Sequence, residues 1–293
     1  MKKVFLLTLS TIILSMLAFS GAAWATPLSI YDIQYTADPA GISPYVGQTV
    51  DCEGGIVINK FGGSKPKVTL YDPAHADGWG GLAIKDWTTS KDFYNTVQIG
   101  DWVSFTGTAV EEANGNTQLQ FQSTSDYIID PSRAGTLPEP VVVSPADVAA
   151  PLYQSSPQGW FVADHSAEKY EAMYLKLLDV TVTANGLGKA GDNYVLQAPA
   201  GSVSWASDYM NADTGGRVYH PLVTVGAHFQ SVAGIVEQYA RTNTSGNSWD
   251  YYQVLTTGTA DFVVPEPATC LLVLAGAGKA RNRRRATRCA KTG

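Results

Sequence analysis

The stretch most like a ligand-binding cluster lies at residues 72–78, where Asp72, His75 and Asp77 place two carboxylates and an imidazole within six residues. Oxygen and nitrogen donors of this kind can hold calcium or another metal ion. The spacing is not that of an EF-hand loop, and the Asp-Gly pair that ends the stretch is typical of a turn. We interpret the segment as a solvated loop and expect no cofactor. A metal site on these three residues is a weak alternative.

Histidine placement argues against the common hydrolase motifs. The chain has four histidines, and none of them forms an HExxH, HxH or HxxxH arrangement. A GxSxG nucleophile motif and a GxxxxGK[ST] phosphate loop are also missing from the sequence. Hydrolysis needs a nucleophile or metal, a base, and a group that stabilises developing charge. The sequence therefore favours a protein that is not an enzyme, with a secreted hydrolase of unrecognised site as an alternative.

Aromatic side chains offer another kind of chemistry, the stacking of ligand rings. In the first half of the chain, Tyr71, Trp79 and Trp87 are the candidate ligand-binding residues. Trp79 is the best candidate for exposure because glycines surround it. A second group of rings contains Trp205, Tyr209, Tyr219, Trp249, Tyr251 and Tyr252. We expect most rings of both groups to be core residues and a minority to be available to a ligand.

The charge of the body bears on what that ligand is. Residues 26–265 contain 11 Lys and Arg against 25 Asp and Glu, a balance of −14. The whole chain stands at −6 because seven basic residues lie in its C-terminal tail. Neutralisation of phosphates by cations dominates nucleic-acid affinity. The balance therefore favours a polysaccharide over a nucleic acid, and an accessory nucleic-acid-binding protein is the alternative.

Short β-strands are the elements that must position these residues. Residues 46–54 and 99–107 share one layout, an apolar-Gly pair followed by alternating apolar and polar residues and a second glycine. Residues 225–236 form a third, slightly longer copy. Alternation predicts half-buried strands, and the glycines allow the sharp bend of a strand in a small closed barrel. Cys52, the only cysteine of the body, lies on such a strand and is expected to be buried.

A proline-rich junction divides the chain into two strand regions. We predict an all-β protein with one small antiparallel barrel at residues 26–136 and a second at 168–263. Residues 137–167 are predicted to be a linker. Within it, Ser144 followed by Pro145 predicts the start of a short helix, with the serine as its cap.

Four stretches in each half carry a resemblance to a known module. In the first half they are residues 30–34, 46–57, 99–107 and 115–119. In the second half they are residues 170–173, 191–196, 231–236 and 250–255, with Ala172 where the pattern usually has glycine. Both sets resemble the OB-fold modules of exported bacterial proteins. The resemblance implies two OB-like barrels in tandem, and it implies a fold more than an activity.

The N-terminus has the three parts of a secretory signal peptide. Lys2 and Lys3 form its positive start, and residues 4–18 are almost entirely apolar. Ala23 and Ala25 place small residues at the positions that signal peptidase inspects. The apolar run is shorter than the roughly 20 residues of a membrane anchor. We therefore expect signal peptidase to remove residues 1–25 and the mature protein to be exported.

The C-terminal segment, residues 264–293, joins Pro265-Glu266-Pro267 to an apolar run and a basic cluster. That cluster contains Arg283, Arg284 and Arg285. This order resembles the PEP-CTERM sorting signal. The resemblance implies transient anchoring in the inner membrane by a short apolar and basic helix. It also implies processing near Pro-Glu-Pro by an exosortase-like enzyme and release to the cell envelope or extracellular matrix. Together, these features predict an exported, non-enzymatic binding or structural protein.

Overall fold

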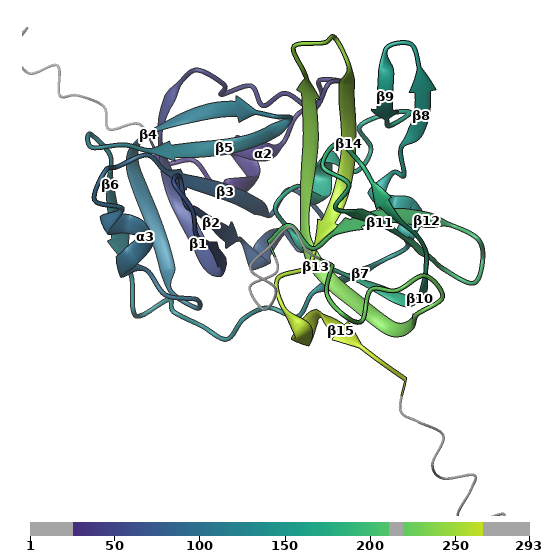
Figure 1. Cartoon of the computed structure of the whole chain (residues 1–293). Helices are drawn as coiled ribbons and strands as arrows, with labels where there is room; N and C mark the ends of the chain where they lie inside the picture. The colour runs from purple at the N-terminus through teal and green to yellow at the C-terminus, as the bar shows by residue number, and fades with distance from the viewer. Residues whose placement is uncertain (1–25, 211–218, 266–293) are drawn as a thin grey trace, which may run out of the picture.

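The computed structural model describes residues 26–210 and 219–265 (Figure 1). The signal peptide predicted at residues 1–25, with Ala23 and Ala25, lies outside the described residues. So does the tail from Glu266 onward, with Pro267 and the basic cluster of Arg283, Arg284 and Arg285. Pro265 is exposed at the last described position. Within the described ranges, no helix combines the length and the apolar character that a membrane crossing requires. Export and sorting remain predictions.

Two β-barrels with a strand-bearing connection make up the described chain (Figure 1). The first region contains α2 (Ile30–Gln34), β1 (Thr49–Phe61), β2 (Lys67–Tyr71), η1 (Pro73–His75), β3 (Gly81–Asp86), α3 (Asp92–Thr96), β4 (Trp102–Ala113), β5 (Asn116–Phe121) and β6 (Asp126–Ile129). The connection contains β7 (Val141–Val143), η2 (Pro145–Val148), β8 (Leu152–Ser155) and β9 (Gln158–Phe161). The second region contains η3 (Glu168–Tyr170), β10 (Tyr174–Leu187), β11 (Asn193–Gln197), β12 (Val203–Ser207), β13 (His228–Thr242), β14 (Ser248–Leu255), η4 (Thr259–Asp261) and β15 (Phe262–Val263).

The first barrel closes in the strand order β1-β2-β3-β5-β4, because β4 also pairs with β1. Only the β3–β5 pair is parallel, and β6 extends the sheet beside β4. Side chains that alternate toward the inside, such as Val68 and Leu70, are fully buried, as is Cys52 at 1% exposed. Phe93 of α3 closes one end of the barrel, with its ring against Phe105. The barrel and the buried cysteine predicted from the alternating pattern are confirmed.

The second barrel repeats this topology with β10, β11, β12, β14 and β13 in the same order. Again one pair is parallel, that of β12 with β14. The core is filled by rings that are fully buried, those of Tyr194, Phe229 and Tyr252. A five-stranded barrel of this order is the OB-like arrangement. The predicted fold of two OB-like barrels in tandem is therefore confirmed.

The connection between the barrels is more than a linker. Val141–Val143 forms β7, which pairs in parallel with β10, and β9 pairs with β14. The three consecutive valines have high β propensity but lack the alternation from which strands were predicted. The expected short helix is one turn of 3₁₀ helix, capped by Ser144, whose hydroxyl accepts a hydrogen bond from the Ala146 N–H.

The second barrel packs on the outer face of β2, β3 and β5. On this face, Tyr71 is 2% exposed and belongs to the hydrophobic core of the second barrel. Asn116 donates to the Gln238 carbonyl at 2.6 Å and accepts from the Gln238 N–H at 3.1 Å. The Ala240 N–H donates to the Asn114 carbonyl. These backbone-directed bonds fix the position of β13 against the β4–β5 turn.

Carboxylates are buried where the barrels meet. Glu171 accepts a hydrogen bond from the Thr117 N–H of the first barrel and another from the Gln34 amide. Burial raises the pKa of Glu171 well above its ordinary value, and the neighbouring Glu168 and Glu112 raise it further. Glu168 is 3% exposed and accepts a hydrogen bond from the Tyr252 hydroxyl. The contact between the barrels therefore contains carboxyl groups that hold protons at unusually high pH.

Candidate ligand groove between the barrels

A groove with a volume of about 400 Å³ lies between the two barrels. Its first wall is the part of the β1-β2-β3-β5 face that the second barrel leaves uncovered, with Phe61, Lys67, Lys85 and Gln118. The strand register places Phe61 beside Lys67 and Lys67 beside Lys85. OB folds bind ligands on this face and on the loops that flank it. The groove is thus the open half of a surface suited to ligands.

The second wall comes from the other barrel, chiefly from the β13–β14 hairpin, which stands between the barrels in Figure 1. Tyr239 and Tyr251 are paired across this hairpin, and Arg241 follows two positions after Tyr239 on the same face. Lys189, in the connection between β10 and β11, and Tyr209, after β12, complete the wall. Corresponding connections of both barrels, β1–β2 and β10–β11, therefore meet at one groove.

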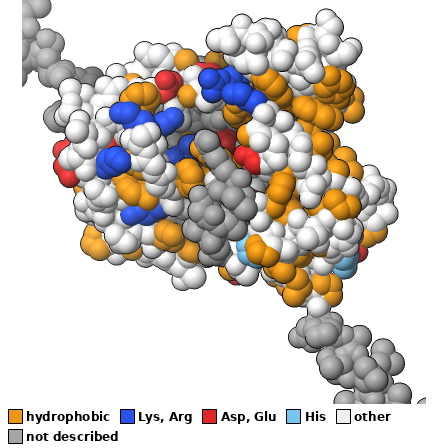
Figure 2. All heavy atoms as spheres, in the orientation of Figure 1, with side chains coloured by type: hydrophobic (Ala, Val, Ile, Leu, Met, Phe, Trp, Pro, Cys, Tyr) orange, Lys and Arg blue, Asp and Glu red, His pale blue; other side chains and the backbone are white. Residues whose placement is uncertain are grey.

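Positive charge is concentrated in this groove. The cations that line it are Lys65, Lys67, Lys85, Lys189 and Arg241, and the anions are Asp192 and Glu237. The described part of residues 26–265 contains ten Lys and Arg and 24 Asp and Glu, so half of the cations and only two anions line the groove. Figure 2 shows several blue side chains on this face of the molecule. The net charge of the body therefore does not describe the groove.

An ion pair joins the two walls. The Lys67 ammonium lies 2.5 Å from a Glu237 carboxylate oxygen, and both side chains are largely buried. Burial lowers the pKa of Lys67, but the Glu237 carboxylate more than offsets this, and the pKa is raised overall. Lys67 therefore stays charged, and its first role is to hold β2 against β13. The other four cations supply the positive charge that the groove presents to solvent.

Several groove cations lie close to aromatic rings. The Lys65 ammonium lies 4.4 Å from the centre of the Trp87 ring, and that of Lys85 lies 5.8 Å from it. On the other wall, Lys189 lies 5.7 Å from the Tyr239 ring. The combination can attract phosphates and stack bases, because every base has a flat face that an aromatic ring can meet.

Hydrogen bonds hold the polar side chains of the second wall. Asn193 donates from its amide to Gln253 at 2.6 Å and accepts from the Tyr251 hydroxyl at 3.2 Å. Gln253 in turn donates to the Glu237 carboxylate at 3.3 Å. A side chain fixed in this way loses little freedom when a ligand binds, which favours affinity.

The three aromatic residues predicted from the sequence to bind a ligand differ in their exposure to solvent. Tyr71 is 2% exposed and packed into the core, so its proposed role as a ligand platform is wrong. Trp79 is half-buried: its backbone N–H donates to the Lys169 carbonyl at 2.6 Å, and its ring packs in a T-shaped arrangement with that of Tyr35. Trp87 is 40% exposed and stays a candidate. The docking of the second barrel thus buries one of the predicted ligand-binding rings, Tyr71, and covers part of another, Trp79.

The Asp72 cluster forms a turn. One Asp72 carboxylate oxygen accepts from the Ala74 N–H and so caps η1, and the other lies 2.8 Å from the His75 Nδ1. Asp77 is exposed in the following turn. Within the described ranges, no three His, Cys, Asp or Glu side chains gather closely enough to hold a metal ion. The interpretation of this stretch as a loop agrees with these bonds.

The groove cations were not singled out in the sequence. One signal was available: residues 26–59 contain no lysine or arginine, whereas residues 60–91 contain five lysines. That cluster points to a locally basic part of the first barrel. Lys189 and Arg241 carry no comparable signal, because only the docking of the barrels brings them to the same groove.

Comparisons with known proteins give little beyond the topology. No protein-family model matches the chain, and no curated protein is similar to it at a significant level. A replication protein A heterotrimer bound to single-stranded DNA is similar at 11% identity and a TM-score of 0.24, over 82% of this chain and 71% of that chain. Fission yeast Pot1 with single-stranded DNA is similar at 11% identity and a TM-score of 0.23, over 73% and 80%. Likenesses this weak carry no argument, so the OB-like assignment rests on the strand order.

Proposed function

We propose that this chain is a non-enzymatic binding protein that holds a single-stranded nucleic acid in the groove between its barrels. The observation that carries the proposal is the gathering of five cations and several aromatic rings in a groove whose first wall is the open ligand face of the first barrel. Phosphates would contact Lys65, Lys85, Lys189 and Arg241. Bases would stack on the rings of the walls.

The acidic remainder of the surface directs such a ligand to the groove. Outside it, the described residues carry five cations and 22 anions, so a polyanion is repelled over most of the protein. Binding through about four phosphate contacts predicts that the logarithm of the binding constant falls with the logarithm of salt at a slope of about −3. We therefore expect modest affinity and a short contact with the strand.

The proposal also covers where the protein is located. A signal peptide at residues 1–25 and a PEP-CTERM-like tail would bring the binding protein to the cell envelope or extracellular matrix, with signal peptidase and an exosortase-like enzyme as processing partners. Intact-mass measurement of the native protein from cell fractions tests this part. Cleavage after Ala25 and near Pro265 is the expected result, and an unprocessed cytoplasmic chain would contradict it.

Fluorescence anisotropy with a labelled 12-nucleotide oligo(dT) tests the binding itself. The mature protein is expected to bind this strand and to prefer it to a duplex of equal length. Arg241→Ala and Lys85→Ala should each weaken binding about threefold to tenfold, whereas the matched control Lys176→Ala should not. Lys176 lies outside the groove, 3.8 Å from the Glu139 carboxylate.

Two results would contradict the nucleic-acid assignment. One is the absence of oligo(dT) binding at low salt. The other is tight binding of an acidic polysaccharide such as polygalacturonate, lost in Arg241→Ala, with no affinity for oligo(dT). In the second case the groove would be a site for anionic polysaccharide.

A further inference from the structure

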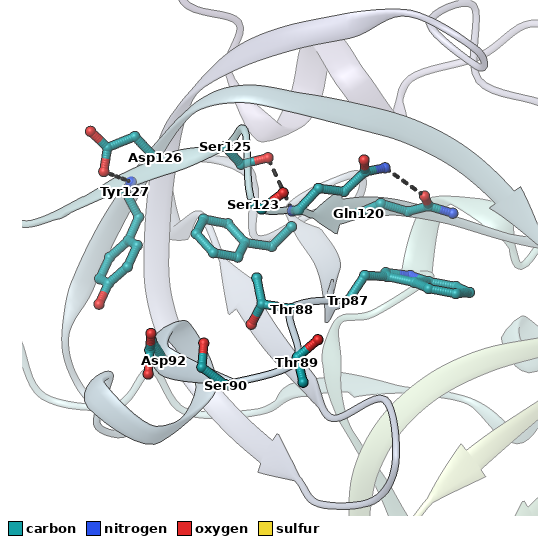
Figure 3. Close-up of a pocket in the computed structure, with 12 residues that line it drawn as sticks. Trp87, Thr88, Thr89, Ser90, Asp92, Gln120, Ser123, Ser125, Asp126 and Tyr127 are labelled. Carbon is teal, nitrogen blue, oxygen red and sulfur yellow. Dashed lines mark hydrogen bonds between the residues drawn. The ribbon is translucent and has the colours of Figure 1, made fainter.

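A separate hollow with a volume of about 810 Å³ lies on the first barrel, beside the ends of β3 and β5 (Figure 3). Three segments line it: residues 87–90 after β3 with Asp92 at the start of α3, residues 120–125 at the end of β5, and the start of β6. In Figure 3, Trp87 and Gln120 lie at one end of the hollow and Asp126 and Tyr127 at the other. The volume is within the range of about 300–1,000 Å³ that is common for small-ligand sites.

The chemistry of this hollow differs from that of the groove. None of its twelve lining residues is a lysine or arginine, and two are carboxylates, Asp92 and Asp126. The other polar groups are the hydroxyls of Thr88, Thr89, Ser90, Ser123, Ser125 and Tyr127 and the amides of Gln120 and Gln122. A polyanion would be repelled here, whereas an uncharged ligand rich in hydroxyl groups would find many donors and acceptors.

Several of these polar groups remain available to a ligand. Thr88 and Ser125 use their hydroxyls to bind Asp86 and the Gly107 carbonyl. The hydroxyls of Thr89, Ser90 and Ser123 make no hydrogen bond to the described residues. Gln122 donates to the Gln120 side-chain oxygen at 3.1 Å, which fixes both amides and leaves the Gln120 amide nitrogen able to donate.

Aromatic rings give the hollow its apolar surface. Trp87 is 40% exposed and projects at one end, and Tyr127 packs edge-on against Phe93 and Phe121 at the other. The negative face of an aromatic ring attracts the weakly positive C–H groups of a sugar ring. A ring at the edge of a hydroxyl-lined hollow thus offers both kinds of contact that a sugar makes.

We propose that this hollow binds a neutral oligosaccharide. The Trp87 indole stacks on one sugar ring, and Asp92, Gln120 and Tyr127 form hydrogen bonds with hydroxyl groups of the oligosaccharide. The site is distinct from the groove between the barrels and does not depend on the groove's ligand. The two sites are close at Trp87 of the hollow, because Lys65 and Lys85 of the groove lie near its ring. Two ligands of different charge could therefore be held side by side on the first barrel.

A glycan array followed by titration calorimetry of the full mature protein tests the proposal. The probes are cellohexaose, laminarihexaose, maltohexaose and xylohexaose, with tri(galacturonic acid) as an acidic comparison. At least one neutral hexasaccharide is expected to bind, and Trp87→Ala should weaken it at least tenfold. Tyr153→Ala, which removes another ring that is about half exposed, should leave the affinity unchanged.

Tyr127→Phe separates this site from the groove, because it removes one hydroxyl and touches no groove cation. Neutral-sugar affinity should fall about threefold or more, whereas oligo(dT) affinity should stay the same. The proposal is overturned by an array with no neutral glycan bound, by binding that Trp87→Ala does not weaken, or by binding of the acidic sugar alone. If the protein binds a neutral sugar but not oligo(dT), the proposal for this hollow is supported and the proposed nucleic-acid function is contradicted.

Discussion

Gly81 of the first barrel lies against the backbone of Ala172 in the second, so closely that a β-carbon on Gly81 would be 2.3 Å from the Ala172 carbonyl carbon. Because both contacting groups are backbone, neither can turn aside as a side chain would. The absence of a side chain at Gly81 is therefore what lets the second barrel sit on the β2-β3-β5 face and form the groove.

Substitution of this glycine should separate the barrels. Gly81→Ala is expected to shift the second barrel, lower the free energy of unfolding by about 1–3 kcal/mol, as overpacking of a tight contact does, and abolish oligo(dT) binding. Small-angle scattering would report a larger radius of gyration. Gly135→Ala is the control, since a β-carbon there meets only ordinary contacts at 3.8 Å and beyond. An unchanged scattering curve for Gly81→Ala would contradict the close packing described.

The protein should lose stability as pH rises from about 4.5 to 8. Burial raises the pKa of Glu168 to about 8 and that of Glu112 to about 7. The folded chain keeps these protons when the unfolded chain has released them, so the free energy of unfolding falls over this range. His165 adds to the fall, because its raised pKa stabilises the folded chain only at lower pH. Urea unfolding measured between pH 4.5 and 8.5 checks how steeply the free energy of unfolding falls with pH.

Glu168→Gln isolates one part of this effect. The neutral amide cannot ionise, so the decline in stability with pH should become shallower. Tyr252, whose hydroxyl donates to Glu168, keeps an acceptor in the amide oxygen. Asp147→Asn, at an exposed cap, is the matched control and should leave the slope unchanged. If the free energy of unfolding falls equally steeply with pH in Glu168→Gln and in the unaltered protein, the explanation by buried carboxyl groups is contradicted.

Replacement of Ala172 by glycine should stabilise the protein. Ala172 has a φ of 56°, in the left-handed region where a β-carbon is strained. We expect Ala172→Gly to raise the free energy of unfolding by roughly 0.5–1 kcal/mol, since removal of the strain outweighs the entropy that glycine adds to the unfolded chain. Ala233→Gly, on β13 with ordinary backbone angles, should instead lower it by roughly 1 kcal/mol. Chemical unfolding of both variants measures whether each substitution raises or lowers the free energy of unfolding.

Alternation along single strands was sufficient to predict the barrels. Residues 46–54 and 99–107 lead into β1 and β4, and they pair as an antiparallel closed sheet requires. The sites were harder to predict because they depend on groups far apart in the chain. Lys67 meets Glu237 only after the barrels dock, and the same docking buries Tyr71 at the end of β2. Net charge did not indicate the groove either, because it averages a basic groove with an acidic surface.

The central claim is that the groove between the barrels binds a single strand through its cations. Its most direct test is the salt dependence of oligo(dT) binding for the unaltered protein and for a variant with Lys85→Ala and Arg241→Ala together. The account predicts a slope of about −3 for the unaltered protein and a slope shallower by about 1.4 for the variant, as expected for two lost phosphate contacts. Equal slopes, or a slope near zero in the unaltered protein, would contradict it.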